Sequence, residues 1–149
     1  SGNVYVSDAN NGRIRKITPA GEVSTFAGSG ILATTDGIGS AASFHYPQGV
    51  AVDVSGNVYV CDPYNGKIRK ITPARVVTTL AGSAATGSTD GLVSSASFNF
   101  PSGLVVDANG NVYVADRSNN KIRKITQYGY SVSPALPAGL VLNADGSIT

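Results

Sequence analysis

The chain of 149 residues contains no methionine or tryptophan, one cysteine (Cys61) and one histidine (His45). A single cysteine excludes an intrachain disulfide, and a single histidine excludes a histidine-rich metal site. Charged residues make up only 13% of the chain, about half the roughly 25% of a typical globular domain. The formal net charge of +2 excludes a strongly basic nucleic-acid arm and a strongly acidic tail. No apolar run approaches the ~18 residues of a membrane span. The missing methionine predicts a processed chain or a fragment.

The chain does contain an internal repeat of 54 residues. The segment Gly-Asn-Val-Tyr-Val at residues 2–6 recurs at 56–60 and again at 110–114, and Ile-Arg-Lys-Ile-Thr at 14–18 recurs with the same offset. Residues 1–54 and 55–108 share 32 identities in 54 positions. A third copy covers residues 109–126 and then departs from the pattern. Such self-similarity is the signature of a repeat architecture, in which each copy forms one structural unit.

Each repeat contains four short runs that predict β-strands, at residues 49–53, 57–62, 67–72 and 76–81. The turn before the third strand contains Asn65-Gly66, which is a strong hairpin signal. The strands become more polar along the series. A four-stranded antiparallel meander of this kind predicts an all-β chain that forms about two and a third blades of a β-propeller.

An insert joins consecutive blades, at residues 29–48 and 83–102. We expect residues 40–44 to form one helical turn, with Phe44 as a buried anchor and Pro47 as its end. Since connections in a meander alternate between the two ends of the sheet, the turn after Asp62 and the insert should share one face. We call it the insert face.

The repeat resembles the NHL repeat, through Gly49-Val-Ala-Val-Asp53, Gly56-Asn-Val-Tyr-Val60 and Asn65-Gly-Lys-Ile-Arg-Lys-Ile71. The insert, with Asp36-Gly37 and Ala42-Ser43-Phe44, resembles the longer version found in bacterial secreted proteins. The resemblance covers residues 1 to about 126 and implies part of a propeller, usually of six blades, to which we assign residues 1–128. Residues 129–149 resemble the start of an immunoglobulin-like module of bacterial surface proteins.

Nine of the eleven basic residues occupy the same three slots of each repeat. A basic rim of this kind would suit RNA, as in some NHL propellers, but the aromatic side chains expected for single-strand stacking are missing beside it. We therefore predict a solvated outer strand whose charges discourage edge-to-edge aggregation. The nine residues are Arg13, Arg15, Lys16, Lys67, Arg69, Lys70, Lys121, Arg123 and Lys124.

Aspartates recur at the end of the second strand and in the Thr-Asp-Gly turns of the insert. A strand-end carboxylate could bind a cation or a substrate hydroxyl in the propeller channel. Its presence in every copy instead favours capping of the following turn through backbone hydrogen bonds. No Asp-x-Asp-x-Asp loop supplies the six or more oxygens that calcium needs. These aspartates remain binding candidates and are Asp8, Asp62, Asp116, Asp36 and Asp90.

The copies differ mainly at positions that we place on the insert face, where a shared scaffold would vary a recognition surface. These positions, together with the lone histidine, add the binding candidates Asn10, Tyr64, Arg117 and His45. The spacing offers His45 no catalytic triad, and one histidine with one cysteine cannot hold zinc. We predict a buried, inert thiol at Cys61 and tyrosines that pack between blades at Tyr59 and its equivalents.

We predict no catalytic residue, metal or cofactor, and expect a non-enzymatic binding or scaffold propeller of a larger secreted or cell-surface bacterial protein. Its partners would be an unidentified protein or carbohydrate and the remaining blades, while the charge balance disfavours nucleic acid. One alternative is part of a propeller enzyme of the metal-dependent lyase or lactonase type, with its site in other blades. A second is an RNA-binding NHL domain that uses the basic rim.

Overall fold

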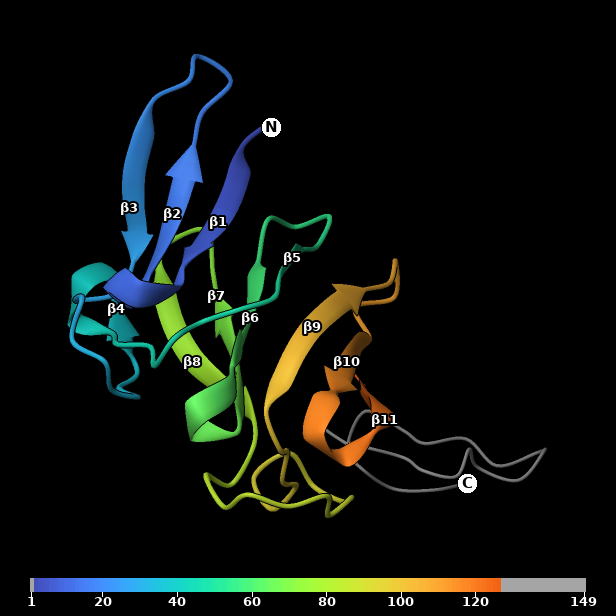
Figure 1. Cartoon of the computed structure of the whole chain (residues 1–149). Helices are drawn as coiled ribbons and strands as arrows, with labels where there is room; N and C mark the ends of the chain where they lie inside the picture. The colour runs from blue at the N-terminus through green and yellow to red at the C-terminus, as the bar shows by residue number, and fades with distance from the viewer. Residues whose placement is uncertain (1, 127–149) are drawn as a thin grey trace.

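The computed structural model describes residues 2–126, which form three antiparallel sheets arranged side by side (Figure 1). None of the helices in this part of the chain has the length and apolar character needed to cross a bilayer. The region expected to begin an immunoglobulin-like module lies outside the described residues. The strands are β1 (Val4–Asp8), β2 (Arg13–Ile17), β3 (Val23–Ala27), β4 (Gly37–Ile38), β5 (Val50–Val52), β6 (Val58–Asp62), β7 (Lys67–Ile71), β8 (Val76–Ala81), β9 (Pro101–Val106), β10 (Val112–Asp116) and β11 (Lys121–Ile125).

The middle sheet confirms the predicted four-stranded meander, because β5, β6, β7 and β8 are hydrogen-bonded neighbours in chain order. Strand β6 pairs with β7 in a register that places Val58 opposite Ile71 and Cys61 opposite Ile68. The sequence did not predict β4, which comes from the insert of the preceding blade. It pairs with β8, with Gly37 opposite Val77, and so covers part of an edge that would otherwise be open to other chains.

One-turn 3₁₀ helices connect the second and third strands of each blade, namely η1 (Ala9–Asn11), η3 (Pro63–Asn65) and η4 (Arg117–Asn119). A further one-turn helix, η2 (Gly39–Ala41), lies in the first insert, one residue earlier than the predicted turn begins. Gly66 closes η3 in the left-handed conformation, with φ 57°. Asn120 occupies the same slot after η4, with φ 51°, because asparagine tolerates this conformation better than most residues.

The innermost strands β5 and β9 lie side by side, as the two neighbouring ribbons at the centre of Figure 1 show. The backbone N–H of Gly49 donates to the carbonyl oxygen of Ser102 at 3.0 Å. A Cβ atom on Gly49 would lie only 2.7 Å from the Cα of Gly103. Glycine at this slot therefore permits the close approach of two neighbouring blades.

Two apolar cores fill the spaces between neighbouring sheets, and each contains a phenylalanine from an insert. Phe44 is fully buried with Val58 and Val60 in the first core, and Phe98 is buried with Tyr59 in the second. The expected anchoring role of Phe44 and the expected packing of Tyr59 between blades are confirmed. The equivalents of Val58 and Val60 in the first blade are exposed, because no described blade covers that face.

Truncation of the insert anchor should be costly because the cavity cannot be filled by neighbouring strands. We expect Phe44→Ala to lower the free energy of unfolding by about 3–5 kcal/mol, measured by urea denaturation. The matched apolar control Val54→Ala lies at a 92% exposed turn and should change it by no more than about 0.5 kcal/mol. Equal effects of the two substitutions would contradict this packing.

Candidate functional site

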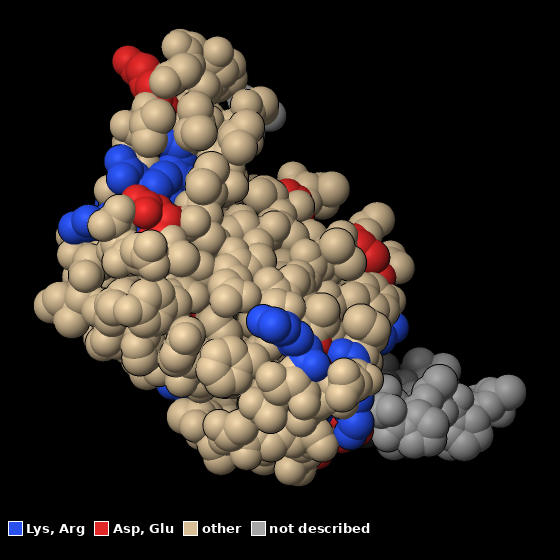
Figure 2. All heavy atoms as spheres, viewed as in Figure 1, with Lys and Arg blue, Asp and Glu red and all other residues tan. Residues whose placement is uncertain are grey.

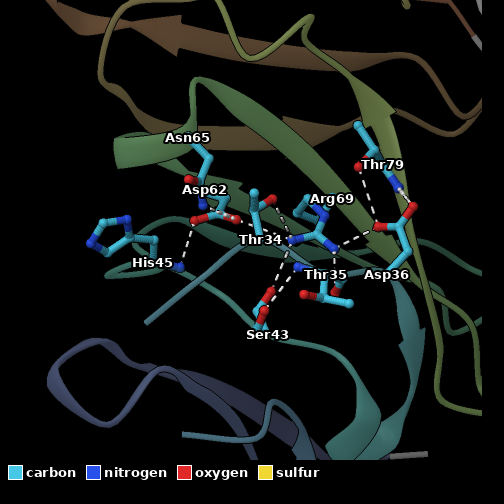
Figure 3. A network of polar contacts seen from close by, with 9 residues as sticks. All are labelled: Thr34, Thr35, Asp36, Ser43, His45, Asp62, Asn65, Arg69 and Thr79. Atoms are coloured by element: carbon cyan, nitrogen blue, oxygen red, sulfur yellow. Dashed lines mark hydrogen bonds and ion pairs between the residues drawn. The ribbon is translucent and has the colours of Figure 1, made fainter. Parts of the chain in front are cut away.

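The carboxylate of Asp62, at the end of β6, is fully buried and accepts hydrogen bonds from several directions (Figure 3). Its Oδ1 accepts the backbone N–H of His45 at 2.8 Å. Its Oδ2 accepts the side-chain amide of Asn65 at 3.1 Å and Nη1 of Arg69 at 3.1 Å. No side-chain cap is formed on η3. The prediction that Asp62 caps the backbone of the following turn is therefore wrong. Its bond within that turn comes from the side chain of Asn65, and its other bonds reach the insert and the next strand.

Arg69, in the middle of β7, is the partner that joins Asp62 to the insert (Figure 3). Its guanidinium is fully buried and forms a second ion pair with Asp36 at 2.6 Å. It also donates to the carbonyl oxygens of Ser43 and Thr35, both at 3.0 Å. A cation–π contact places it 5.2 Å from the ring of Phe44. Among the buried side-chain nitrogen and oxygen atoms of the described residues, only Nε of Arg69 lacks a hydrogen-bond partner.

The same arrangement recurs in the third blade around Arg123, which is 6% exposed. Arg123 pairs with Asp116 at 2.9 Å and with Asp90, and it lies 5.1 Å from the ring of Phe98. In the first blade, Arg15 pairs with Asp8 and keeps a side-chain exposure of 31%. Among the described residues, Arg15 donates to Asp8 and to the carbonyl oxygen of Ser24.

These arginines correct the prediction that the basic slots form a solvated outer strand. The middle slot points inward and is neutralised by aspartates, while Lys121 and Lys124 are exposed as expected. Sequence reasoning missed this division because Lys67 and Arg69 are two residues apart and would share one face of a regular strand. On the face shown in Figure 2, Lys and Arg gather in small separate groups and leave most of the surface uncharged.

In both aspartates that Arg69 contacts, burial acts to raise the pKa and hydrogen bonding acts to lower it, but the balance differs between the two. Burial raises the pKa of Asp62, and the bonds from His45, Asn65 and Arg69 only partly oppose this. Burial also acts to raise the pKa of Asp36, but the bonds from Arg69 and Thr79 outweigh it and lower that pKa. Because both carboxylates already have partners, neither offers a free ligand. Within residues 2–126, no three His, Cys, Asp or Glu side chains gather as metal ligands would.

The remaining feature of the insert face is a cluster of four aromatic side chains that spans two blades. We call His45, Tyr46, Tyr64 and Phe100 the aromatic surface. The ring of Tyr64 lies 5.1 Å from that of His45, 5.1 Å from that of Tyr46 and 5.0 Å from that of Phe100, centroid to centroid. Tyr64 is 54% exposed and Phe100 is 38% exposed. The structure thus brings together two of the predicted candidates and adds two that the sequence did not single out.

Tyr46 and Phe100 occupy equivalent slots and share an unusual backbone conformation, with φ 54° and 52°. Each precedes a proline, which normally favours an extended conformation in the residue before it. Bulky residues held at positive φ cost on the order of 1–3 kcal/mol and cluster at functional sites. An aromatic residue followed by proline in both inserts is the sequence signal that could have identified them.

The other candidates make none of the ring contacts of this surface. Asn10 and Arg117 are exposed on η1 and η4, the counterparts of the turn that contains Tyr64. Cys61 is fully buried, as predicted, and burial with the neighbouring Asp62 raises the pKa of its thiol to about 12. A cleft of about 320 Å³, lined by Asp53 and Asp107 among others, contains none of the predicted site residues. The carboxylates of both of these aspartates accept hydrogen bonds from their own turns.

The three neighbouring antiparallel sheets define the class of protein, because they form part of a β-propeller. The NHL repeat family model matches residues 44–71 and 98–125, so the chain contains NHL repeats. It is 41% identical over 91 residues to Protein SUPPRESSOR OF QUENCHING 1, chloroplastic, of Arabidopsis thaliana, an alignment covering 60% of this chain and 9% of that protein. The chain spans about a tenth of the length of the curated relatives it matches.

Solved structures show the same fold. A protein of unknown function from Bacteroides thetaiotaomicron is similar with a TM-score of 0.76 and 36% identity, covering 82% of this chain and 32% of that one. An auxiliary nutrient binding protein from the same bacterium is similar with a TM-score of 0.73 and 28% identity, covering 83% and 34%.

Removal of the buried arginine should leave Asp62 without its counter-charge. We expect Arg69→Met to lower the free energy of unfolding at pH 7 by about 3–5 kcal/mol in urea denaturation. The deficit should shrink as the pH falls. Arg69 acts to lower the pKa of Asp62, so the folded variant that lacks it takes up a proton at a higher pH than the folded parent does. Adding Asp62→Asn should restore part of the loss.

Arg15→Met is the matched control, since Arg15 occupies the same slot of the first blade in a partly exposed pair. It should cost no more than about 1 kcal/mol. Similar losses in the two variants, or no recovery on acidification, would contradict the role assigned to Arg69.

Proposed function

We propose that this chain is a non-enzymatic binding segment of a propeller in a larger secreted or cell-surface bacterial protein, and that it recognises its partner through the aromatic surface. The observation that carries the proposal is the cluster of Tyr64, Phe100, Tyr46 and His45 on the insert face. Exposed aromatic side chains that cluster on a rigid frame are typical of recognition surfaces, where tyrosine often contributes most of the binding energy.

The chemistry of the other candidates supports binding over catalysis in this part of the chain. Asp62 and Asp116 are fully buried in ion pairs, and Cys61 holds its proton firmly. A nucleophile or general base needs access to its substrate, which these groups lack. The similar nutrient binding protein from Bacteroides thetaiotaomicron adds support for a binding role and a bacterial source.

The scattered charge also bears on the RNA alternative. An RNA-binding surface combines a continuous basic patch with aromatic side chains. The aromatic surface is instead formed by neutral residues and His45, and Arg69 and Arg123 are withdrawn into the interior. The proposal therefore places recognition on the insert face and assigns the basic slots to the scaffold.

A selection experiment tests whether ligands bind the chain through the aromatic surface. Random peptides displayed on phage and a broad glycan array should both be probed with the 149-residue chain, and every ligand found should then be measured with Tyr64→Ala. We expect Tyr64→Ala to weaken binding by tenfold or more without changing the melting temperature, since Tyr64 is exposed. Val54→Ala should leave binding unchanged. Ligands that bind both variants like the parent chain would overturn the proposal.

A further inference from the structure

We propose that the aromatic surface is a subsite for a neutral carbohydrate, an inference that rests on the proposed function and names its ligand class. The first support is the arrangement of the rings. Tyr46, Tyr64 and Phe100 follow one another across two blades, with neighbouring ring planes inclined by 50° and 68°. This gives an uneven row of ring faces and edges.

Ring faces of this kind suit the C–H groups of a sugar. An aromatic face carries partial negative charge, and the C–H groups on the face of a pyranose carry partial positive charge. His45 lies at a shallow angle to both tyrosines, 27° to Tyr46 and 33° to Tyr64, whereas the Tyr46–Tyr64 and Tyr64–Phe100 pairs are steeply inclined. The steeply inclined faces of Tyr46, Tyr64 and Phe100 suit a ligand whose C–H groups point in several directions, as those of a puckered sugar ring do.

The polar atoms of the surface are the second support. The hydroxyls of Tyr46 and Tyr64 and the ring nitrogens of His45 make no hydrogen bond to any other residue among those described. A carbohydrate offers many hydroxyl groups that both donate and accept, and a few well-placed polar groups among aromatic rings are what fixes the orientation of a small ligand. A purely apolar protein side chain would leave these three groups without partners.

The third support is that none of the four side chains of the aromatic surface is a carboxylate, an ammonium or a guanidinium group. Asp62, directly behind the surface, is fully buried and shares Arg69. It accepts the backbone N–H of His45, so it holds the loop without presenting charge to a ligand. A neutral ligand avoids the cost of burying a charge without a counter-ion.

The backbone behind the rings is already fixed, which lowers the entropic cost of binding. His45 is tied to Asp62 at 2.8 Å, and the second insert is tied to η4 by a bond from Ser118 N–H to the carbonyl oxygen of Asn99 at 3.0 Å. Tyr64 follows Pro63, which is buried at the first position of η3. The rings are therefore presented by three segments held in place without ligand.

Affinity electrophoresis tests the ligand class, with the 149-residue chain run through gels that contain soluble neutral polysaccharides (dextran, mannan, starch, xyloglucan), anionic ones (alginate, heparin) or poly(U) RNA. We expect retardation by at least one neutral polysaccharide. Tyr64→Ala should weaken that binding by tenfold or more, Tyr64→Phe by a smaller factor through loss of its hydroxyl, and Val54→Ala not at all. Phe100→Gly should also weaken binding while relieving the positive φ, and an unchanged melting temperature would show that its effect is not a folding defect.

The outcomes separate this inference from the proposed function. Retardation only by alginate, heparin or RNA, or by no polysaccharide at all, overturns the carbohydrate assignment. If displayed peptides nevertheless bind and lose affinity in Tyr64→Ala, the aromatic surface remains the binding site and the ligand is a protein. If a neutral polysaccharide binds Tyr64→Ala as well as the parent chain, the inference is wrong even though the chain binds sugar.

Discussion

The buried ion-pair network of Arg69 is the interaction on which the rest of this structure depends. One guanidinium joins a strand-end carboxylate, a carboxylate from the preceding insert and two insert carbonyl groups, and it lies against the insert's phenylalanine. Buried charge is expensive unless every partner is present, so the network can form only when insert and blade take one relative position. Its recurrence around Arg123 shows that the 54-residue repeat encodes the junction between blades as well as the blade itself.

This junction also determines what the insert face can present. Asp62 holds Arg69 through one oxygen and the backbone of His45 through the other, so the same carboxylate links the core to the loop that carries the aromatic surface. The strained backbone at Tyr46 persists because the surrounding loop is fixed on both sides. Recognition and folding are thereby divided between neighbouring residues, with aspartate and arginine inside and the aromatic rings outside.

Much of the fold follows from the sequence, because strand runs, turn residues and the 54-residue period point to the same meander. Phe44 and Tyr59 could be placed in the core from their slots alone. The buried state of Arg69 could not, because a charge in a strand is ordinarily solvated and its partners Asp36 and Ser43 are distant in sequence. For the same reason Asp62 was assigned to a local turn. Of the site, Tyr64 could be identified through variation between copies and His45 as the single histidine, whereas Tyr46 and Phe100 emerged only from the three-dimensional approach of two inserts.

Amide hydrogen exchange in Arg69→Lys tests most directly whether this network fixes the insert to the next blade. Lysine keeps the charge but lacks the planar guanidinium group, whose several N–H donors reach different acceptors at once. The account predicts faster exchange confined to residues 34–46 and to Thr79, whose N–H bonds Asp36, with the pairing of β5 and β6 unchanged. Unchanged exchange in residues 34–46, or equal acceleration in every strand, would contradict it.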